Sequence, residues 1–400
     1  MALASMTGSD TQPRLGQRLA ALAPSAIIEV GRKVRELRAA GRDIIHLGAG
    51  IPTPSPEFLT QPFQIRPEMN QLHDPAGDVA LRTGISNRLR EDYGLKYDPL
   101  TQIVVTVGAK QALYASLISL INPGDEVAIL DPSWVTYGPS IELAGGIPKS
   151  FSLDRERGYA LDVDALKAVC GPKTRVIVLN TPHNPTGRVF TRDELQPIAD
   201  FALERGLWVI SDESFDKFVF DGNQHLSIAA LPSMQDRTII LKSFSKAYGF
   251  IGGRVGYVAA PAPVAVLLRR FNEHVVSCVS PMLQSIALAL LDGDPAWTDT
   301  LRSAYQIKRD FVAAAVDAIP GMTCALPDGT FYIWADISPL EKSAAAFCDR
   351  LLTEAGVALT PGETFGSLGE GFVRFNLAGP MAPMEEGMRR VDAFVREHYA

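Results

Sequence analysis

The sequence predicts an α/β fold, with a mainly parallel sheet between helices and a smaller α+β unit after it. Three observations support this prediction. The middle of the chain alternates short β-rich runs with amphipathic helical stretches, as strands joined by crossover helices do. The strand-like runs are almost continuously apolar, which is typical of strands buried on both faces. A length of 400 residues allows about two to four domains.

Six runs in the middle of the chain are the predicted strands of the sheet. A helical stretch, Lys110–Ile121, follows the first of them. Parallel sheets bind ligands beyond the carboxyl ends of their strands, so the residues after each run are candidates for a site. The runs are Gln102–Val107, Glu126–Leu130, Arg175–Asn180, Leu207–Ser211, Thr238–Leu241 and Arg254–Ala259.

The last third of the chain changes character and predicts the separate α+β unit. Helical patterns extend from about Val264 to Ile319, with breaks near Pro281 and near residues 292–295. We expect Arg35–Gly50 to join this unit, because that segment precedes the central sheet. The elements predicted after the long helices are, in order, a strand, a helix, a strand and a helix: Phe331–Asp336, Glu341–Ala355, Phe372–Asn376 and residues 383–398.

Composition argues against several classes of protein. The formal net charge is −7 and no long basic block occurs, which disfavours nucleic-acid binding. The four cysteines have no CxxC spacing and the six histidines form no HxH or HxxxH pair, so we expect no metal and buried free thiols in a reducing cytosol. The most apolar stretch, Val275–Leu291, is too short and polar to span a membrane, and the N-terminus lacks a signal peptide's apolar core. These features predict a cytoplasmic protein.

The first strand ends carry groups suited to a ligand. Gly108 and Ala109, followed by Lys110, open a helix, where bare N–H groups and the helix dipole favour an anion. A plain strand–helix turn would have the same sequence. Trp134 follows the second strand and either stacks on a flat ring or packs in the core.

Later strand ends add chemically specific groups. Asn184 lies in the TPHNPTG loop, whose prolines restrict the backbone. Asp212 ends a buried strand, where a carboxylate needs a cationic partner. Ser243 and Lys246 follow the next strand, and Arg254 comes eight residues after the lysine. One small molecule, pyridoxal 5′-phosphate (PLP), would use all of these groups, since it has a phosphate, a flat ring, a pyridinium and an aldehyde that a lysine can bind as a Schiff base.

The chain resembles the fold type I PLP-dependent aminotransferases of class I/II, most closely the aspartate aminotransferase-like subgroup, from Pro24 to the C-terminus. This resemblance implies a PLP-dependent transferase fold: residues 51–295 as a large PLP-binding domain with a mainly parallel seven-stranded sheet, 296–400 as a small domain, and 1–50 as an N-terminal arm and the first part of the small domain. It also implies a homodimer. The matching motifs are TVGAKQAL, DPSWVTY, NTPHNPTG, SDESF, SFSKAYGFIGGRVGY, DGTFYI and VRFNLAG.

The resemblance assigns a role to each candidate residue. Lys246 matches the lysine that forms the Schiff base and moves a proton between the substrate Cα and the cofactor carbon. Asp212 matches the partner of the pyridine nitrogen. Asn184 matches the residue that bonds the phenolic oxygen of the cofactor and contacts the substrate. Other matches are Trp134, the stacking ring, and Arg374 with the backbone of Gly50, which grip the substrate carboxylate. The residues matching the phosphate cup are Gly108, Ala109, Lys110, Ser243 and Arg254.

The activity implied is transfer of an amino group from an L-amino acid to a 2-oxo acid by ping-pong chemistry. One alternative is a PLP enzyme of another reaction type on the same scaffold: a lyase, an oxidase or a decarboxylating enzyme. Another is a ligand-sensing regulator, but such proteins carry an added DNA-binding domain, and the two dozen residues before PSAIIEV are too few for a helix-turn-helix.

Some positions depart from the family pattern. Phe215 stands where the family usually has a tyrosine that donates to the phenolic oxygen, so we expect the cofactor's visible transition at a higher pH than in relatives. Leu72 stands near the position where the family usually has a tyrosine that reaches the phosphate of the partner subunit. Either fewer groups hold the phosphate, or His73 or Tyr137 takes the place of that tyrosine. Lys110 matches a lysine that reads acidic side chains in some relatives. Ile51 and Thr53 stand where many relatives have acidic residues. This difference leaves open a biosynthetic enzyme with an unusual substrate.

Overall fold

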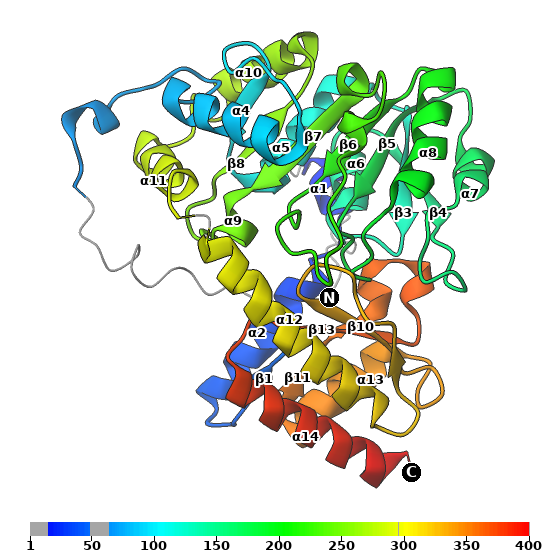
Figure 1. Ribbon diagram of the computed structural model, residues 1–400. Coiled ribbons are helices and arrows are strands. Elements are labelled where there is room, and N and C mark those ends of the chain that lie inside the picture. Colours follow the sequence, from blue (N-terminus) through cyan, green and yellow to red (C-terminus); the bar gives the residue numbers. More distant parts are fainter. Residues whose placement is uncertain (1–14, 49–63, 295, 400) are drawn as a thin grey trace, which may run out of the picture.

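The computed structural model describes residues 15–48, 64–294 and 296–399. Figure 1 shows two parts. The large unit contains a seven-stranded sheet flanked by helices and is formed by the middle of the chain. The small unit combines the N-terminal helix α2 (Ala26–Ala39) with the last third of the chain. The fold class predicted from the sequence is confirmed, whereas the domain boundaries remain a prediction.

The large sheet has the strand order β2-β8-β7-β6-β5-β3-β4. Strands β3 to β7 are parallel, and β8 runs antiparallel to both β7 and β2. The sheet is therefore mainly parallel, as predicted. The strands are β2 (Ile103–Thr106), β3 (Glu126–Asp131), β4 (Ile147–Ser152), β5 (Thr174–Asn180), β6 (Trp208–Asp212), β7 (Thr238–Ser243) and β8 (Gly256–Ala259).

Two predictions about this sheet need correction. Strand β4 was not among the six predicted runs, because it lies at the sheet edge, is largely exposed and has a proline and a lysine in its sequence IPKSFS. Strand β8 begins at Gly256, so Arg254 is not a strand residue. The backbone of Arg254 is left-handed, with φ of 50°, and this residue belongs to the turn before β8.

Helices cover both faces of the sheet because successive strand residues point to opposite sides. Val127 and Ile129 of β3 pack with α5 and α10, whereas Ala128 and Leu130 pack with α7 and α8. Helix α8 begins with a capping box between Thr191 and Glu194. The helices are α4 (Val79–Tyr93), α5 (Gly108–Leu120), α6 (Tyr137–Leu143), α7 (Val163–Val169), α8 (Arg192–Arg205), α9 (Phe244–Ala247), α10 (Ala262–Val275) and α11 (Pro281–Leu291).

The small unit is built on an antiparallel sheet of order β12-β13-β10-β9. A parallel pair, β1 with β11, joins Ile45 to Val357, which confirms the expectation for Arg35–Gly50 over its described residues. The predicted helix Glu341–Ala355 is shorter as an α-helix and ends in a π-helical turn, Leu351–Ala355. The remaining elements of the small unit are β1 (Ile45–His46), α12 (Ala296–Asp317), β9 (Thr323–Cys324), β10 (Tyr332–Asp336), α13 (Ala344–Arg350), β11 (Val357–Ala358), β12 (Thr360–Pro361), β13 (Phe372–Asn376) and α14 (Met381–His398). The short helix α1 (Gln17–Ala20) instead contacts α6 of the large unit.

The cysteines and the helix lengths complete the comparison with the sequence. All four cysteines are free thiols, but only Cys348 is fully buried, and the other three are partly exposed. Within the described ranges, no helix combines the length and the apolar character needed to cross a membrane.

Candidate active site

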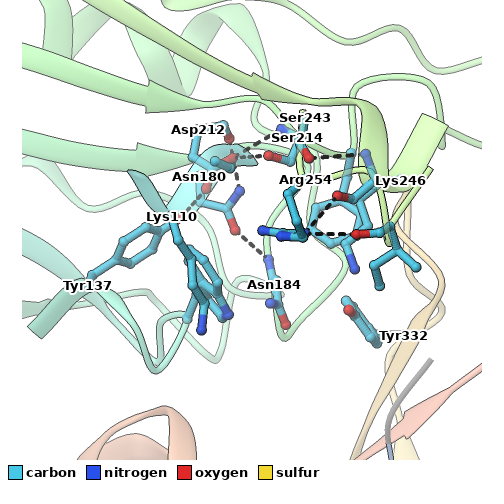
Figure 2. A pocket seen from close by; sticks show the side chains of 15 residues that line it. Lys110, Tyr137, Asn180, Asn184, Asp212, Ser214, Ser243, Lys246, Arg254 and Tyr332 are labelled. Atoms are coloured by element: carbon cyan, nitrogen blue, oxygen red, sulfur yellow. Dashed lines mark hydrogen bonds between the residues drawn. The ribbon is translucent and has the colours of Figure 1, made fainter. Parts of the chain in front are cut away.

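A cavity of about 180 Å³ opens at the carboxyl ends of the central strands, beside the first turn of α5. Figure 2 shows side chains from both units converging on it. The parallel strands explain this convergence, since their carboxyl ends meet at one edge of the sheet. The lining residues are Ala109, Lys110, Trp134, Tyr137, Asn180, Asn184, Asp212, Ser214, Phe215, Ser243, Ser245, Lys246, Ile251, Arg254 and Tyr332.

Asp212, the last residue of β6, presents a buried carboxylate to the cavity. The Ser214 hydroxyl donates to its Oδ1 at 2.6 Å, and the Tyr137 hydroxyl donates to its Oδ2 at 3.0 Å (Figure 2). Burial raises the pKa of Asp212, while these hydrogen bonds oppose the rise. No cation of the described residues pairs with this carboxylate, so the cavity is suited to a ligand that brings a positive charge or a proton.

Two asparagines connect Asp212 to the neighbouring loop. The Asn180 amide donates to the backbone oxygen of Asp212 at 2.9 Å and accepts from the Asn184 backbone N–H at 2.8 Å. The Oδ1 atom of Asn184 accepts from Arg374 Nη1 at 2.8 Å. Because its oxygen is engaged by the guanidinium, the Asn184 side chain has its Nδ2 donor left for a ligand.

Lys246 lies on the short helix α9, which follows β7 and is capped by the Ser243 hydroxyl. Its Nζ lies 5.8 Å from the ring centroid of Phe215 and 5.5 Å from that of Phe331. No carboxylate in the described part of the chain pairs with this ammonium group. An amine in such surroundings is available for chemistry with a ligand carbonyl.

Cationic and hydroxyl groups gather at the other end of the cavity. Arg254 Nη1 donates to the backbone oxygen of Ile251 at 3.1 Å and contacts the Ser245 hydroxyl at 3.4 Å. Gly108 begins α5 with φ of 71°, and a Cβ there would lie 2.6 Å from Arg254 Nη2. The helix has no side-chain cap at its N-terminus, and Lys110 lies in its first turn. Burial and the nearby Arg254 lower the pKa of Lys110. This end of the cavity is suited to an anion.

Arg374 on β13 brings a buried guanidinium from the small unit to the edge of the site. Its guanidinium carbon lies 4.0 Å from the ring centroid of Tyr332 and 4.7 Å from that of Phe365. Its Nη2 donates to the Gly48 backbone oxygen at 3.2 Å, but its Nε has no hydrogen-bond partner among the described residues. Burial lowers the pKa of Arg374. A guanidinium with an unsatisfied buried donor is suited to a carboxylate ligand.

The structure brings together most of the residues that the sequence singled out. Arg374 joins the cavity through Asn184, and Gly108 lies against Arg254. Gly50 lies outside the described residues. The predicted residues that line the cavity directly are Ala109, Lys110, Trp134, Asn184, Asp212, Ser243, Lys246 and Arg254.

Other cavity residues were not predicted, or were assigned differently. Asn180 and Ser214 flank Asp212, and Tyr332 lies in the FYIW strand of the small unit. Position in the sequence could have indicated two of these residues, because Asn180 ends β5 and Ser214 follows the end of β6 by two residues. Tyr137 lines the cavity, but its hydroxyl serves Asp212. Leu72 is exposed and is not among the residues lining the cavity.

Comparison with known proteins accounts for this arrangement. The sequence profile described as "Aminotransferase class I and II" matches residues 42–391. The chain belongs to the class I and II aminotransferase family. It is 34% identical over 388 residues to aromatic-amino-acid aminotransferase 2 of Thermococcus litoralis. The aligned region covers 96% of this chain and 98% of that protein. It is 33% identical to the aspartate aminotransferase of Geobacillus stearothermophilus, with 96% and 99% covered.

A solved structure gives the same result. The N-succinyldiaminopimelate aminotransferase of Mycobacterium tuberculosis superposes with a TM-score of 0.88 at 32% identity, covering 95% of this chain and all of that one. The chain is therefore an amino-acid aminotransferase, as its motifs indicated. The alternative of a lyase, an oxidase or a decarboxylating enzyme finds no support among these named relatives.

His183, in the loop before Asn184, predicts a pH dependence of stability. Its ring is fully buried, its Nδ1 pairs with the Thr186 hydroxyl at 2.8 Å, and burial lowers its pKa to about 3. Below the ordinary histidine pKa of about 6.5 the unfolded chain takes up this proton and the folded chain does not, so stability is lost as pH falls from about 6.5 toward 3. At pH 5 the loss amounts to about 2 kcal/mol.

Thermal unfolding of wild type and His183→Asn at pH 7 and pH 5 measures this effect. Asparagine keeps a polar group near the Nδ1 position but does not titrate, so the variant should lose less stability between the two pH values. His274→Asn, at an exposed histidine of α10, is the control and should behave as wild type. An equal loss in wild type and His183→Asn would contradict the prediction.

Proposed function

We propose that this enzyme binds PLP in the cavity and uses it to transfer an amino group from an L-amino acid to a 2-oxo acid. The observation that carries the proposal is the buried Asp212 carboxylate, which has no cationic partner among the described residues and faces the same cavity as Lys246 and Arg254. A pyridine nitrogen, an aldehyde and a phosphate on one rigid ring would satisfy the three groups together.

The residues present fit this cofactor part by part. Asp212 would hold the ring nitrogen, and Lys246 Nζ is the amine that would bind the aldehyde carbon. Trp134 offers an indole face beside the ring site. The phosphate would lie at the N-terminus of α5, where the missing side-chain cap leaves N–H groups for an anion. Proposed phosphate ligands are Gly108, Ala109, Lys110, Ser243 and Arg254.

When bound, PLP supplies an electron sink for the charge that develops at the substrate Cα. Asp212 would keep a proton on the ring nitrogen, and the hydroxyls of Ser214 and Tyr137 hold its carboxylate in place. Asn184 would donate from Nδ2 to the phenolic oxygen, because Arg374 engages its Oδ1. Lys246 Nζ would be the general base that takes the proton from the substrate Cα and carries it.

Arg374 is the proposed site for the substrate α-carboxylate. Within the described part of the chain its Nε lacks a hydrogen-bond partner, and the rings of Tyr332 and Phe365 lie against the guanidinium. Amino acid and oxo acid share this carboxylate, so one arginine serves both half-reactions. The relatives are named for aspartate and aromatic amino acids. Lys110, whose Nζ lies 5.6 Å from the ring centroid of Trp134, is the candidate that would bind an acidic side chain. Gly50 is the proposed backbone donor to the carboxylate.

The remaining proposals concern the assembly and the setting. We propose a homodimer, as the family resemblance implies, and a division into residues 1–50, 51–295 and 296–400. Cytoplasmic residence is consistent with four free thiols. Size-exclusion chromatography with light scattering tests the dimer.

A spectral screen tests the function. The purified protein is loaded with PLP, and each L-amino acid is added with and without 2-oxoglutarate while the visible spectrum is recorded. The proposal requires that at least one amino acid shifts the spectrum alone and turns over only when an oxo acid is present. Product formed without any oxo-acid acceptor would instead indicate a lyase.

Phe215 gives a separate prediction about the cofactor. Its buried ring packs edge-on against Phe331 and Tyr332, with centroids 5.3 and 5.6 Å apart, and it carries no hydroxyl. Phe215→Tyr would add a donor to the phenolic oxygen and so favour its anionic form. The pH midpoint of the visible transition should fall by roughly 1–2 units, as expected for a hydrogen bond to a charged group.

A pH titration of the visible spectrum measures that shift. Phe215→Leu, which also changes the ring but adds no hydroxyl, is the control and should leave the midpoint where wild type has it. A Phe215→Tyr protein with the wild-type midpoint would show that this position does not reach the phenolic oxygen.

A further inference from the structure

Asp131, the last residue of β3, has a buried carboxylate that faces the small unit. Its Oδ2 accepts from the Ser367 hydroxyl at 2.6 Å and from the Ser367 backbone N–H at 3.2 Å, and its Oδ1 accepts from the Leu368 N–H at 3.2 Å. No cation of the described residues pairs with it. The carboxylate is therefore satisfied entirely by one loop of the other unit.

The loop fits this carboxylate closely. Gly366 precedes the two donor residues and has φ of 133°, a conformation that favours glycine. A Cβ at this position would collide with the Asp131 carboxylate. The Ser133 backbone N–H donates to the Phe365 oxygen at 2.6 Å, which adds a second link two residues along the same strand end.

This contact joins the two halves of the proposed site. On the large-unit side, the segment that begins at Asp131 continues directly to Trp134, which lines the cavity. On the small-unit side, Phe365 lies over the guanidinium of Arg374 and packs edge-on against Trp334, with centroids 5.5 Å apart. The position of the guanidinium relative to the cavity thus depends on how the Phe365–Leu368 loop is held.

We propose that Asp131 is a positioning residue for catalysis. Its hydrogen bonds from Ser367 and Leu368, called the clasp below, hold Phe365 and hence Arg374 at the proper distance from the ring site. The inference rests on the proposed carboxylate-binding role of Arg374. Asp131 touches neither substrate nor cofactor in this scheme. Its effect should therefore appear in substrate affinity and orientation, while cofactor binding is preserved.

Asp131→Ala tests the clasp through steady-state kinetics on the PLP-loaded enzyme, with the amino acid that wild type uses best. We expect KM to rise and kcat/KM to fall by roughly tenfold to 100-fold, the range for a small misplacement of a binding group. The dissociation constant of PLP should remain that of wild type. Ser367→Ala, which removes only the hydroxyl donor, should give a smaller change in the same direction.

Asp162→Ala is the matched control. This carboxylate also accepts from two backbone N–H groups, those of Asp164 and Ala165, but it caps α7 away from the small unit. Both alanine variants should lower Tm, and only Asp131→Ala should raise KM. Wild-type KM in Asp131→Ala, or the same KM rise in Asp162→Ala, would overturn the proposal and leave the carboxylate with a stabilising role alone.

Two further measurements keep the outcome decisive. If Asp131→Ala fails to fold, Asp131→Asn keeps one acceptor oxygen and should show an intermediate KM. Hydrogen exchange on the protein without substrate should show faster exchange at residues 365–368 and 372–376 in the Asp131 variants than in Asp162→Ala; unchanged exchange there would contradict the clasp. Failure of the wild-type spectral screen would instead reject the proposed function.

Discussion

Lys246→Ala should abolish transamination while the protein still binds PLP. The substitution removes the amine that binds the aldehyde and moves the Cα proton, so turnover should fall by at least about 10³-fold. Asp212 and Arg254 remain in place to hold the ring and the phosphate. Turnover with the amino acid found in the spectral screen measures the first effect, and absorbance after gel filtration measures PLP retention.

A second lysine provides the control for this experiment. Lys308 is half-buried, its Nζ lies 5.4 Å from the ring centroid of Tyr305, and it donates to the Gly379 backbone oxygen at 2.7 Å. Lys308→Ala removes a lysine near an aromatic ring outside the cavity, so it should retain turnover. Added methylamine should restore part of the activity of Lys246→Ala, because it replaces the lost base. Full activity in Lys246→Ala without any added amine would refute the assignment.

Arg374→Gln should lower kcat/KM by about 10³-fold for the amino donor and by a similar factor for the oxo-acid acceptor. Both substrates carry the carboxylate that the guanidinium binds, and loss of one partner from a buried, hydrogen-bonded charge pair costs about 2–5 kcal/mol. Arg374→Lys keeps the charge but not the two-pronged geometry, so it should recover only part of the loss. Single-turnover rates of each half-reaction provide the comparison.

Arg309 is the matched control for this guanidinium. It is also buried, lies over an aromatic ring at 4.9 Å from Phe220, and pairs with Asp221, but it belongs to α12 outside the cavity. Arg309→Lys should lower Tm and leave kcat/KM at the wild-type value. If Arg374→Gln affected only one half-reaction, its assignment to the shared carboxylate would be wrong.

Much of the large unit was predictable because its strands are buried on both faces. Such strands are continuous apolar runs, and β5 and β6 appear in the structure with nearly the bounds expected. Strand β4 escaped because an edge strand exposed to solvent has no such pattern. The short β1–β11 pair also depends on partners more than 300 residues apart, which local patterns do not encode.

The sequence by itself determined which reactive groups exist and that Asn184, Asp212 and Lys246 come at or after strand ends, whereas Arg254 was identified by its spacing from Lys246. Only the tertiary structure decided how they are held. The hydrogen bond from the Tyr137 hydroxyl to Asp212, the one from Arg374 to the Asn184 amide oxygen, and the one from Ser367 to Asp131 join residues 75 to 236 positions apart. Hydrogen bonds of that kind depend on distances of a few ångströms, which the folded chain fixes and linear spacing does not.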